Sequence, residues 1–235
     1  QTKADNMFQI TPSASAAKVI ANDNCFQVCF TDPNQGTASA DYIASKGLAT
    51  KVAVIYNSSD AYSSGIYDNF KAEAAAKGLD LVASEAFTGD SKQDFSSQLS
   101  KIKASGAELI FLPIYYQEAS LILSQAKNAG ITAKFFGCDG LDGLLNIENF
   151  DKSLAENVML LTPFAANATD ETTKKFVAAY NAKYDPSTLN QFAADAYDAV
   201  YIVKAAAEKA GVTGDMSVSD ICNALKGAMT EITVD

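Results

Sequence analysis

The feature that most constrains the fold is a series of short apolar segments, each followed by polar or aromatic residues. Residues 51–56 (KVAVIY) lead into a polar loop and a helix, 107–114 end at Tyr115, and 134–138 end at Asp139. Apolar strands that alternate with helices are typical of a parallel sheet covered on both faces. Ligands of such sheets bind outside the carboxyl ends of the strands. The pattern therefore predicts a doubly wound α/β fold and the edge of the sheet at which a ligand would bind.

Hydrophobic periodicity and turn residues predict the remaining elements. Strands are expected at 7–10, 25–30, 51–56, 80–86, 108–114, 134–138, 158–162 and 231–234. Helices are expected up to Ser45 and at 62–77, 91–105, 117–129, 169–184, 189–210 and 217–228, and Gly78, Gly106 and Gly130 follow three of them as C-terminal glycines. The helices after Pro163 have few strands to cover, which predicts two lobes with one of them incomplete in this chain.

Composition excludes several classes of function. The chain has 235 residues, a net charge of −10 and no histidine. The acidic balance argues against nucleic acid and anionic membrane surfaces as partners. Without histidine the commonest general base and metal ligand are missing, and no phosphate-binding or hydrolase motif occurs. We therefore expect neither an enzyme nor a cofactor or metal. The four cysteines match no zinc pattern and are interpreted as buried thiols.

Small hydroxyl residues follow the first expected strand. The segment Thr11–Ser15 (TPSAS) enters an expected short helix, and free amides at a helix start can bind a carboxylate. The alternative is ordinary helix capping by Ser13 or Ser15.

Three other side chains follow strands of the expected sheet. Asp139 comes directly after an apolar strand and before Gly140, where it could neutralise an ammonium group or serve as a turn residue. Tyr62 and Tyr115 follow two other strands, where an aromatic ring can stack on a ligand or simply pack at the rim of the sheet. Each residue taken alone leaves both interpretations open.

Taken in order, these segments resemble the type I periplasmic binding proteins. The closest branch is that of the leucine/isoleucine/valine, or branched-chain amino-acid, receptors of ABC transporters. The resemblance covers nearly the whole chain and rests on an ordered set of motifs: ITPSAS at 10–15, TDPNQG at 31–36, KVAVIY at 51–56, YSSG at 62–65, DFSSQLSKIKASGAELIFLPIYYQEA at 94–119, AKNAG at 126–130, FFGCDG at 135–140 and ADAYDAVY at 194–201.

The resemblance implies two α/β lobes that close on a ligand about a hinge. Carried onto this sequence, the crossovers fall near 31–34 and at Thr162 and Pro163. Residues 1–33 and 163–235 would then form a partial first lobe, and residues 34–162 the complete second lobe. Because the family's first lobe begins with further strands, the chain resembles part of a receptor. Its uncovered apolar surface predicts self-association.

The resemblance also implies an amino-acid site and a role. The family's loop for the ligand's carboxylate and ammonium groups matches Ser13, Ala14 and Ser15, and its ligand tyrosines match Tyr62 and Tyr115. Its acidic partner for the ammonium is usually Glu, whereas this chain has the shorter Asp139. The implied function is a solute-binding component of an ABC importer that binds an amino acid or similar zwitterion between the lobes.

The implied partners are a small-molecule ligand and a membrane permease. The implied location is extracytoplasmic, either periplasmic or as a cell-surface lipoprotein, for a protein made with a signal peptide. Two alternatives remain: a ligand-sensing receptor domain of the same fold, and an α/β enzyme, which the missing histidine disfavours.

Overall fold

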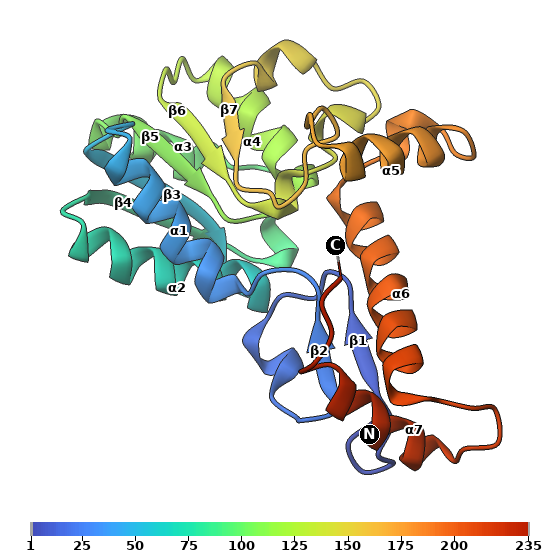
Figure 1. Cartoon of the computed structure of the whole chain (residues 1–235). Coiled ribbons are helices and arrows are strands. Elements are labelled where there is room, and N and C mark those ends of the chain that lie inside the picture. Colours follow the sequence, from blue (N-terminus) through green and yellow to red (C-terminus); the bar gives the residue numbers. More distant parts are fainter. Residues whose placement is uncertain (1, 235) are drawn as a thin grey trace. The chain divides into compact units, whose positions relative to one another are not determined.

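The computed structural model describes residues 2–234, which divide into two compact units. Unit 1 consists of residues 2–30 and 192–234, and unit 2 of residues 31–191. Each unit is described by itself (Figure 1). Residues 163–191, which the family resemblance assigns to the first lobe, belong to compact unit 2. The lobe boundary near Thr162 stays a prediction, because it concerns movement of the lobes rather than compactness.

Unit 2 is built on a parallel five-stranded sheet. The strands are β3 (Lys51–Asn57), β4 (Asp80–Phe87), β5 (Leu109–Leu112), β6 (Lys134–Gly137) and β7 (Val158–Leu160). Their order in the sheet is β4-β3-β5-β6-β7, and every neighbouring pair is parallel. The chain moves outward from β3 in one direction and then from β5 in the other, so the topological switch point lies between β3 and β5. The predicted doubly wound sheet is confirmed.

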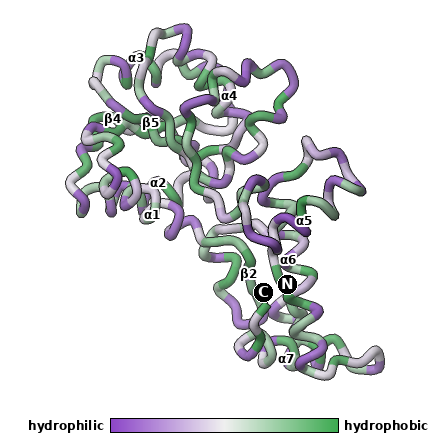
Figure 2. Tube along the Cα trace, turned by 45° about the horizontal axis from the view of Figure 1, so that its top comes forward, coloured by the Kyte–Doolittle hydropathy of each residue, from purple (hydrophilic) through white to green (hydrophobic). Residues whose placement is uncertain are grey.

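Four helices cover the two faces of this sheet: α1 (Asp32–Ser45), α2 (Ala61–Ala76), α3 (Ser96–Ser105) and α4 (Tyr116–Asn128). Strand β5 is hydrophobic along its whole length (Figure 2) because both of its faces are buried. Successive side chains of β3 alternate between the faces. Val52 and Val54 pack with α1 and α2, whereas Ala53 and Ile55 pack with α3 and α4.

Local sequence signals fix the ends of these helices. Asp60 caps α2 by accepting a hydrogen bond from the Ser63 backbone at 2.9 Å. The three glycines predicted to end helices all have left-handed backbone angles, with φ of 74° at Gly78, 72° at Gly106 and 68° at Gly130. These predictions are confirmed.

The rest of unit 2 consists of short helical segments around the sheet. They are η2 (Gly89–Ser91), η3 (Asp139–Leu141), η4 (Leu144–Asn146), η5 (Lys152–Ala155), α5 (Glu171–Asn181) and η6 (Pro186–Thr188). The predicted helix at 91–105 begins later than expected, at Ser96. Its early part is interrupted because the Asp94 side chain accepts hydrogen bonds from the backbone and hydroxyl of Ser96, which competes with helical hydrogen bonding.

Unit 1 has a two-stranded parallel sheet of β1 (Gln9–Thr11) and β2 (Cys25–Gln27), joined through η1 (Ala17–Ile20). Helix α7 (Val218–Ala228) lies wholly in this unit, as does all of α6 (Gln191–Ala210) after its first residue. A small apolar cluster of this unit contains buried Ala206, Leu225 and Ala228. The predicted strand at 231–234 is wrong: the described residues there form no strand, and Ile232 packs against that cluster instead.

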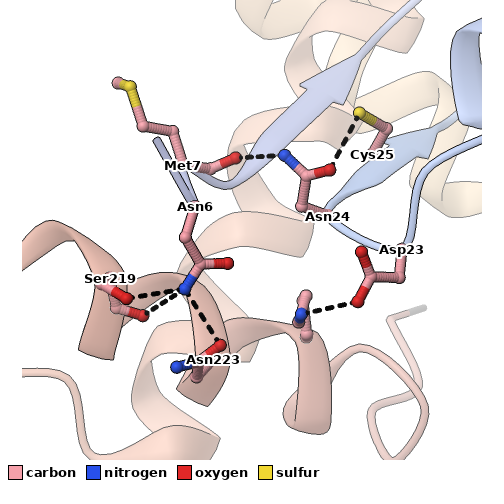
Figure 3. Close-up of polar contacts among 8 residues, drawn as sticks. Asn6, Met7, Asp23, Asn24, Cys25, Ser219 and Asn223 are labelled. Atoms are coloured by element: carbon pink, nitrogen blue, oxygen red, sulfur yellow. Dashed lines mark hydrogen bonds and ion pairs between the residues drawn. The ribbon is translucent and has the colours of Figure 1, made fainter. Parts of the chain in front are cut away.

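Polar contacts connect β1, β2 and α7 within unit 1 (Figure 3). The Asn6 amide donates to Ser219 Oγ at 2.7 Å and to Asn223 Oδ1 at 3.1 Å. Lys226 Nζ lies 2.8 Å from Asp23 Oδ2. Asn24, which is buried, donates to the Met7 carbonyl at 2.6 Å. Side-chain hydrogen bonds therefore hold the strands and the helix of this unit together.

The cysteines are buried, as predicted. Little surface of Cys25, Cys29, Cys138 or Cys222 is exposed to solvent. Among the described residues, no helix is both long and apolar enough to cross a membrane.

Candidate ligand-binding site

The three candidate residues of unit 2 lie at the carboxyl edge of its sheet. Tyr62 is in the first turn of α2, after β3, and Tyr115 directly precedes α4, after β5. Asp139 begins η3, immediately beyond β6. Because β3 and β5 flank the topological switch point, both tyrosines lie where parallel sheets of this kind bind ligands.

Tyr62 and Asp139 are in direct contact although 77 positions separate them in sequence. The Tyr62 hydroxyl donates to Asp139 Oδ1 at 2.6 Å and accepts a hydrogen bond from the Gly140 backbone at 2.9 Å. Asp139 is 3% exposed and Tyr62 is 8% exposed. The two residues therefore form one buried polar pair rather than two independent groups.

Tyr115 extends this pair towards solvent. Its ring stacks on that of Tyr62 with centroids 4.8 Å apart, yet Tyr115 is 42% exposed. Partial burial, together with the negative charges of nearby acidic residues, raises the pKa of Tyr115 to about 12, and Asp60 and Asp139 make the largest charge contributions. An exposed aromatic face beside several carboxylates suits a cationic group.

Burial dominates the electrostatics of Asp139. Loss of hydration raises the pKa of its carboxyl group, while the hydrogen bond from the Tyr62 hydroxyl and, to a smaller extent, the nearby side-chain amides of Gln35 and Gln191 oppose that rise. Burial also raises the pKa of the Tyr62 hydroxyl strongly. A buried carboxylate with a raised pKa gains from a cationic partner, which would replace part of the lost hydration.

Two glutamines complete the surroundings of Asp139, and sequence analysis did not find them. Gln35 on α1 is fully buried, and its Oε1 accepts from the Asp139 backbone at 3.3 Å. Gln191 is also fully buried; its backbone donates to Asp142 Oδ2 at 2.7 Å, and its Oε1 accepts from the Thr162 hydroxyl at 2.9 Å. One sequence feature could have identified Gln35: its amide side chain lies on a face of an expected helix that otherwise carries mostly small residues.

The candidate loop of unit 1 lies between β1 and η1. Ser15 is buried and Ala14 is exposed, and the Ala14 backbone donates to Thr11 Oγ1 at 2.9 Å. Neither Ser13 nor Ser15 caps the short helix, because Ala16 occupies the cap position. The capping interpretation is therefore wrong, and ligand binding by Ser13, Ala14 and Ser15 stays a prediction.

Within residues 2–234, no group of three or more histidine, cysteine, aspartate or glutamate side chains is placed to hold a metal ion. Cys138, which directly precedes Asp139 in sequence, is fully buried with Sγ 3.7 Å from Ser39 Oγ, and burial raises the pKa of its thiol. A thiol in that state is a poor nucleophile.

Comparisons with known proteins identify the family of the chain and its fold. A family model described as "Periplasmic binding protein" matches residues 1–234. A Leu/Ile/Val-binding protein homolog from Brucella melitensis is 32% identical over 90% of this chain and 56% of its own length. A leucine-, isoleucine-, valine-, threonine- and alanine-binding protein from Pseudomonas aeruginosa is 29% identical over 94% of this chain and 58% of its own length. The chain thus spans less than three-fifths of the length of these relatives.

Solved structures show the same fold. A leucine-binding protein from Thermotoga maritima has a TM-score of 0.83 at 26% identity, covering 95% of this chain and 63% of its own. The substrate-binding protein of a branched-chain amino-acid transporter from Streptococcus pneumoniae, solved with isoleucine, has a TM-score of 0.82 at 29% identity, covering 95% of this chain and 62% of its own.

These matches confirm the resemblance to type I periplasmic binding proteins that the ordered motifs indicated. The family is one of binding proteins, in agreement with the prediction that the chain is not an enzyme, and it indicates an extracytoplasmic location. The chain belongs to the periplasmic binding protein family.

Proposed function

We propose that this chain is the ligand-binding part of a solute-binding protein that serves an ABC importer, and that its ligand is an amino acid. The observation that carries the proposal is Asp139, a 3%-exposed carboxylate at the ligand edge of the sheet beside an exposed tyrosine ring. The α-ammonium group of the ligand would pair with Asp139, and an apolar ligand side chain would lie against Tyr115.

The similarity to binding proteins for leucine, isoleucine and valine supports a branched-chain amino acid as the first ligand to test. Asp139 is one methylene shorter than glutamate, so the ammonium group must approach closer to the sheet edge than a glutamate would require. Ser13, Ala14 and Ser15 are the proposed contacts of the ligand carboxylate. The proposed partner is a membrane permease, which a periplasmic protein or a cell-surface lipoprotein would reach from outside the cytoplasm.

The decisive experiment is a thermal-shift screen of the full-length gene product against the common L-amino acids, followed by calorimetry. A ligand present at 100 times its Kd stabilises the folded state by about 2.7 kcal/mol, which a melting curve resolves readily. We expect stabilisation by leucine, isoleucine or valine. The 2-keto acid of the same side chain should give none, because it lacks the ammonium group that pairs with Asp139.

Asp139→Asn should sharply reduce the shift, whereas Asp68→Asn, which changes an exposed acid on α2, should leave it unchanged. The proposal is wrong if no amino acid stabilises the protein, or if Asp139→Asn binds as tightly as the native sequence. Self-association of the chain stays a separate prediction, which light scattering can test.

A further inference from the structure

We propose that Tyr62 is a positioning residue, whose hydroxyl fixes the ionised Asp139 carboxylate for the ligand's ammonium group instead of contacting the ligand itself. This inference rests on the proposed function. It assigns different roles to two tyrosines that the family resemblance treats alike: Tyr115 is the aromatic contact, and Tyr62 acts only through Asp139.

The first argument is that the Tyr62 hydroxyl already uses its one proton in a hydrogen bond within the protein. A phenolic hydroxyl has one proton to donate. The Gly140 backbone N–H donates to the Tyr62 oxygen at 2.9 Å, so that oxygen acts as the acceptor in this contact. The single hydroxyl proton is therefore directed to Asp139 Oδ1 at 2.6 Å, a distance typical of hydrogen bonds to a charged oxygen. No proton remains for a ligand carboxylate.

The second argument is that the backbone is shaped for this contact. A Cβ atom at position 140 would lie 2.7 Å from the Tyr62 hydroxyl oxygen and 2.7 Å from the Ile114 carbonyl oxygen. Real Cβ atoms essentially never approach other atoms so closely. Glycine at position 140 is therefore what allows the hydroxyl to reach the start of η3.

The third argument is the order of the stacked rings. Tyr62 is 8% exposed, whereas Tyr115, stacked on it at an interplanar angle of 20°, is 42% exposed. The ring of Tyr115 is thus the one that remains available to a ligand. Tyr62 is enclosed between that ring, Gly140 and Asp139.

The fixed hydrogen bond has two consequences for binding. It holds Asp139 in one orientation, which avoids an entropic loss when a ligand binds. It also favours the ionised form of the carboxylate against the effect of burial, so the carboxylate keeps its charge to a lower pH than burial alone would allow.

The test uses Tyr62→Phe, which removes the hydroxyl and keeps the ring. Tyr56→Phe is the matched control, because Tyr56 also belongs to a stacked pair of unit 2, with its ring 3.9 Å from that of Tyr67. In the ligand-free protein, carbon-detected NMR of labelled aspartate should show the Asp139 carboxyl titrating at higher pH in Tyr62→Phe, because the ionised form loses a hydrogen bond. In Tyr56→Phe the Asp139 carboxyl group should titrate at the same pH as in the native protein.

Calorimetry of the full-length gene product with leucine across a pH series then measures the effect on binding. The hydrogen bond is already present in the ligand-free protein, so only part of its strength is lost from binding, and we expect Tyr62→Phe to weaken affinity roughly 10-fold at neutral pH. The acidic limb of the affinity profile should move to higher pH. Gly140→Ala keeps the phenol but crowds both the Tyr62 hydroxyl and the Ile114 carbonyl, so it should weaken affinity at least as much as Tyr62→Phe.

A double-mutant comparison separates positioning from direct contact. In an Asp139→Asn background, Tyr62→Phe should cause no further loss of affinity, because Tyr62 acts only through the carboxylate. An equal loss in both backgrounds, or an unchanged Asp139 titration, would overturn the positioning role. If the native protein binds no amino acid, the proposed function fails and the role in binding fails with it. The ligand-free titration still decides whether the hydroxyl controls the carboxylate.

Discussion

Unit 2 and unit 1 are stabilised by different kinds of contact. In unit 2 the sheet lies between two apolar clusters, and Val54, Ile110 and Phe111 are completely buried. In unit 1 each strand has only three residues, and the apolar cluster has three buried members. The hydrogen bonds of Asn6 and Asn24 and the ion pair of Lys226 connect its elements. The difference indicates that apolar packing stabilises unit 2, whereas polar contacts contribute a larger share of the stability of unit 1.

The largest expected effect is that of Phe111→Ala in unit 2. Phe111 is fully buried in β5 and stacks on Phe70 with ring centroids 4.1 Å apart. Removing its ring creates a cavity that a two-sided core cannot easily fill. We expect the free energy of unfolding to fall by about 3–5 kcal/mol in chemical denaturation. Tyr184→Ala, at a residue 60% exposed, is the control and should change stability by less than about 0.5 kcal/mol.

A loss below about 1 kcal/mol for Phe111→Ala would contradict the view that unit 2 depends on its core. It would mean that the sheet relaxes around the missing ring, as a loosely packed interior does.

A smaller effect is expected from Asn6→Ala in unit 1. This change removes the side-chain hydrogen bonds to Ser219 and Asn223, and it places alanine at a backbone φ of 44°, which asparagine tolerates better. We expect a loss of about 1–2 kcal/mol, detected as faster hydrogen exchange of the β1 and β2 amides. Asn6→Gly removes the same amide without the backbone strain and should cost less. Unchanged exchange in both variants would show that polar contacts do not order unit 1.

The smallest effect concerns the buried carboxyl group of Asp139 in unit 2. Because burial raises the pKa of Asp139, the folded protein holds this proton more tightly than the unfolded chain does. Its contribution to stability is therefore greatest at low pH and is lost as pH rises through the raised pKa. Asparagine cannot ionise, so Asp139→Asn avoids the stability that the native protein loses when this buried carboxyl group ionises. The ligand-free variant should therefore melt a few degrees higher than the native protein at neutral pH, and the difference should disappear in acid. A variant that melts lower at neutral pH would contradict this sign.

Sequence patterns predicted most of unit 2 because its elements are governed by local signals. The apolar run at 109–112 has both faces buried, and a glycine in the left-handed region follows each of three helices. The strand expected at 231–234 failed because β-propensity alone cannot supply a partner strand, and Ile232 finds apolar contacts without one.

The candidate site was only partly predictable for the same reason. The positions of Tyr62, Tyr115 and Asp139 after their strands followed from the parallel sheet. The contact between Tyr62 and Asp139 did not, because it depends on strand order and on the space that Gly140 leaves. The buried amide of Gln35 was missed because a polar residue on a helix is normally expected to face solvent.

The strand order also has a consequence for how the site comes into existence during folding. Every pairing in the five-stranded sheet joins segments separated by a whole crossover, with Val52 paired to Leu109 and Leu109 paired to Lys134. Such long-range pairings form slowly, since loop closure precedes any gain from contacts. Asp139 reaches Tyr62 only after β6 has joined β5 and β5 has joined β3. The hydrogen bond between them is therefore a marker that β3, β5 and β6 have assembled, and a state with only β3 and β4 in place lacks it.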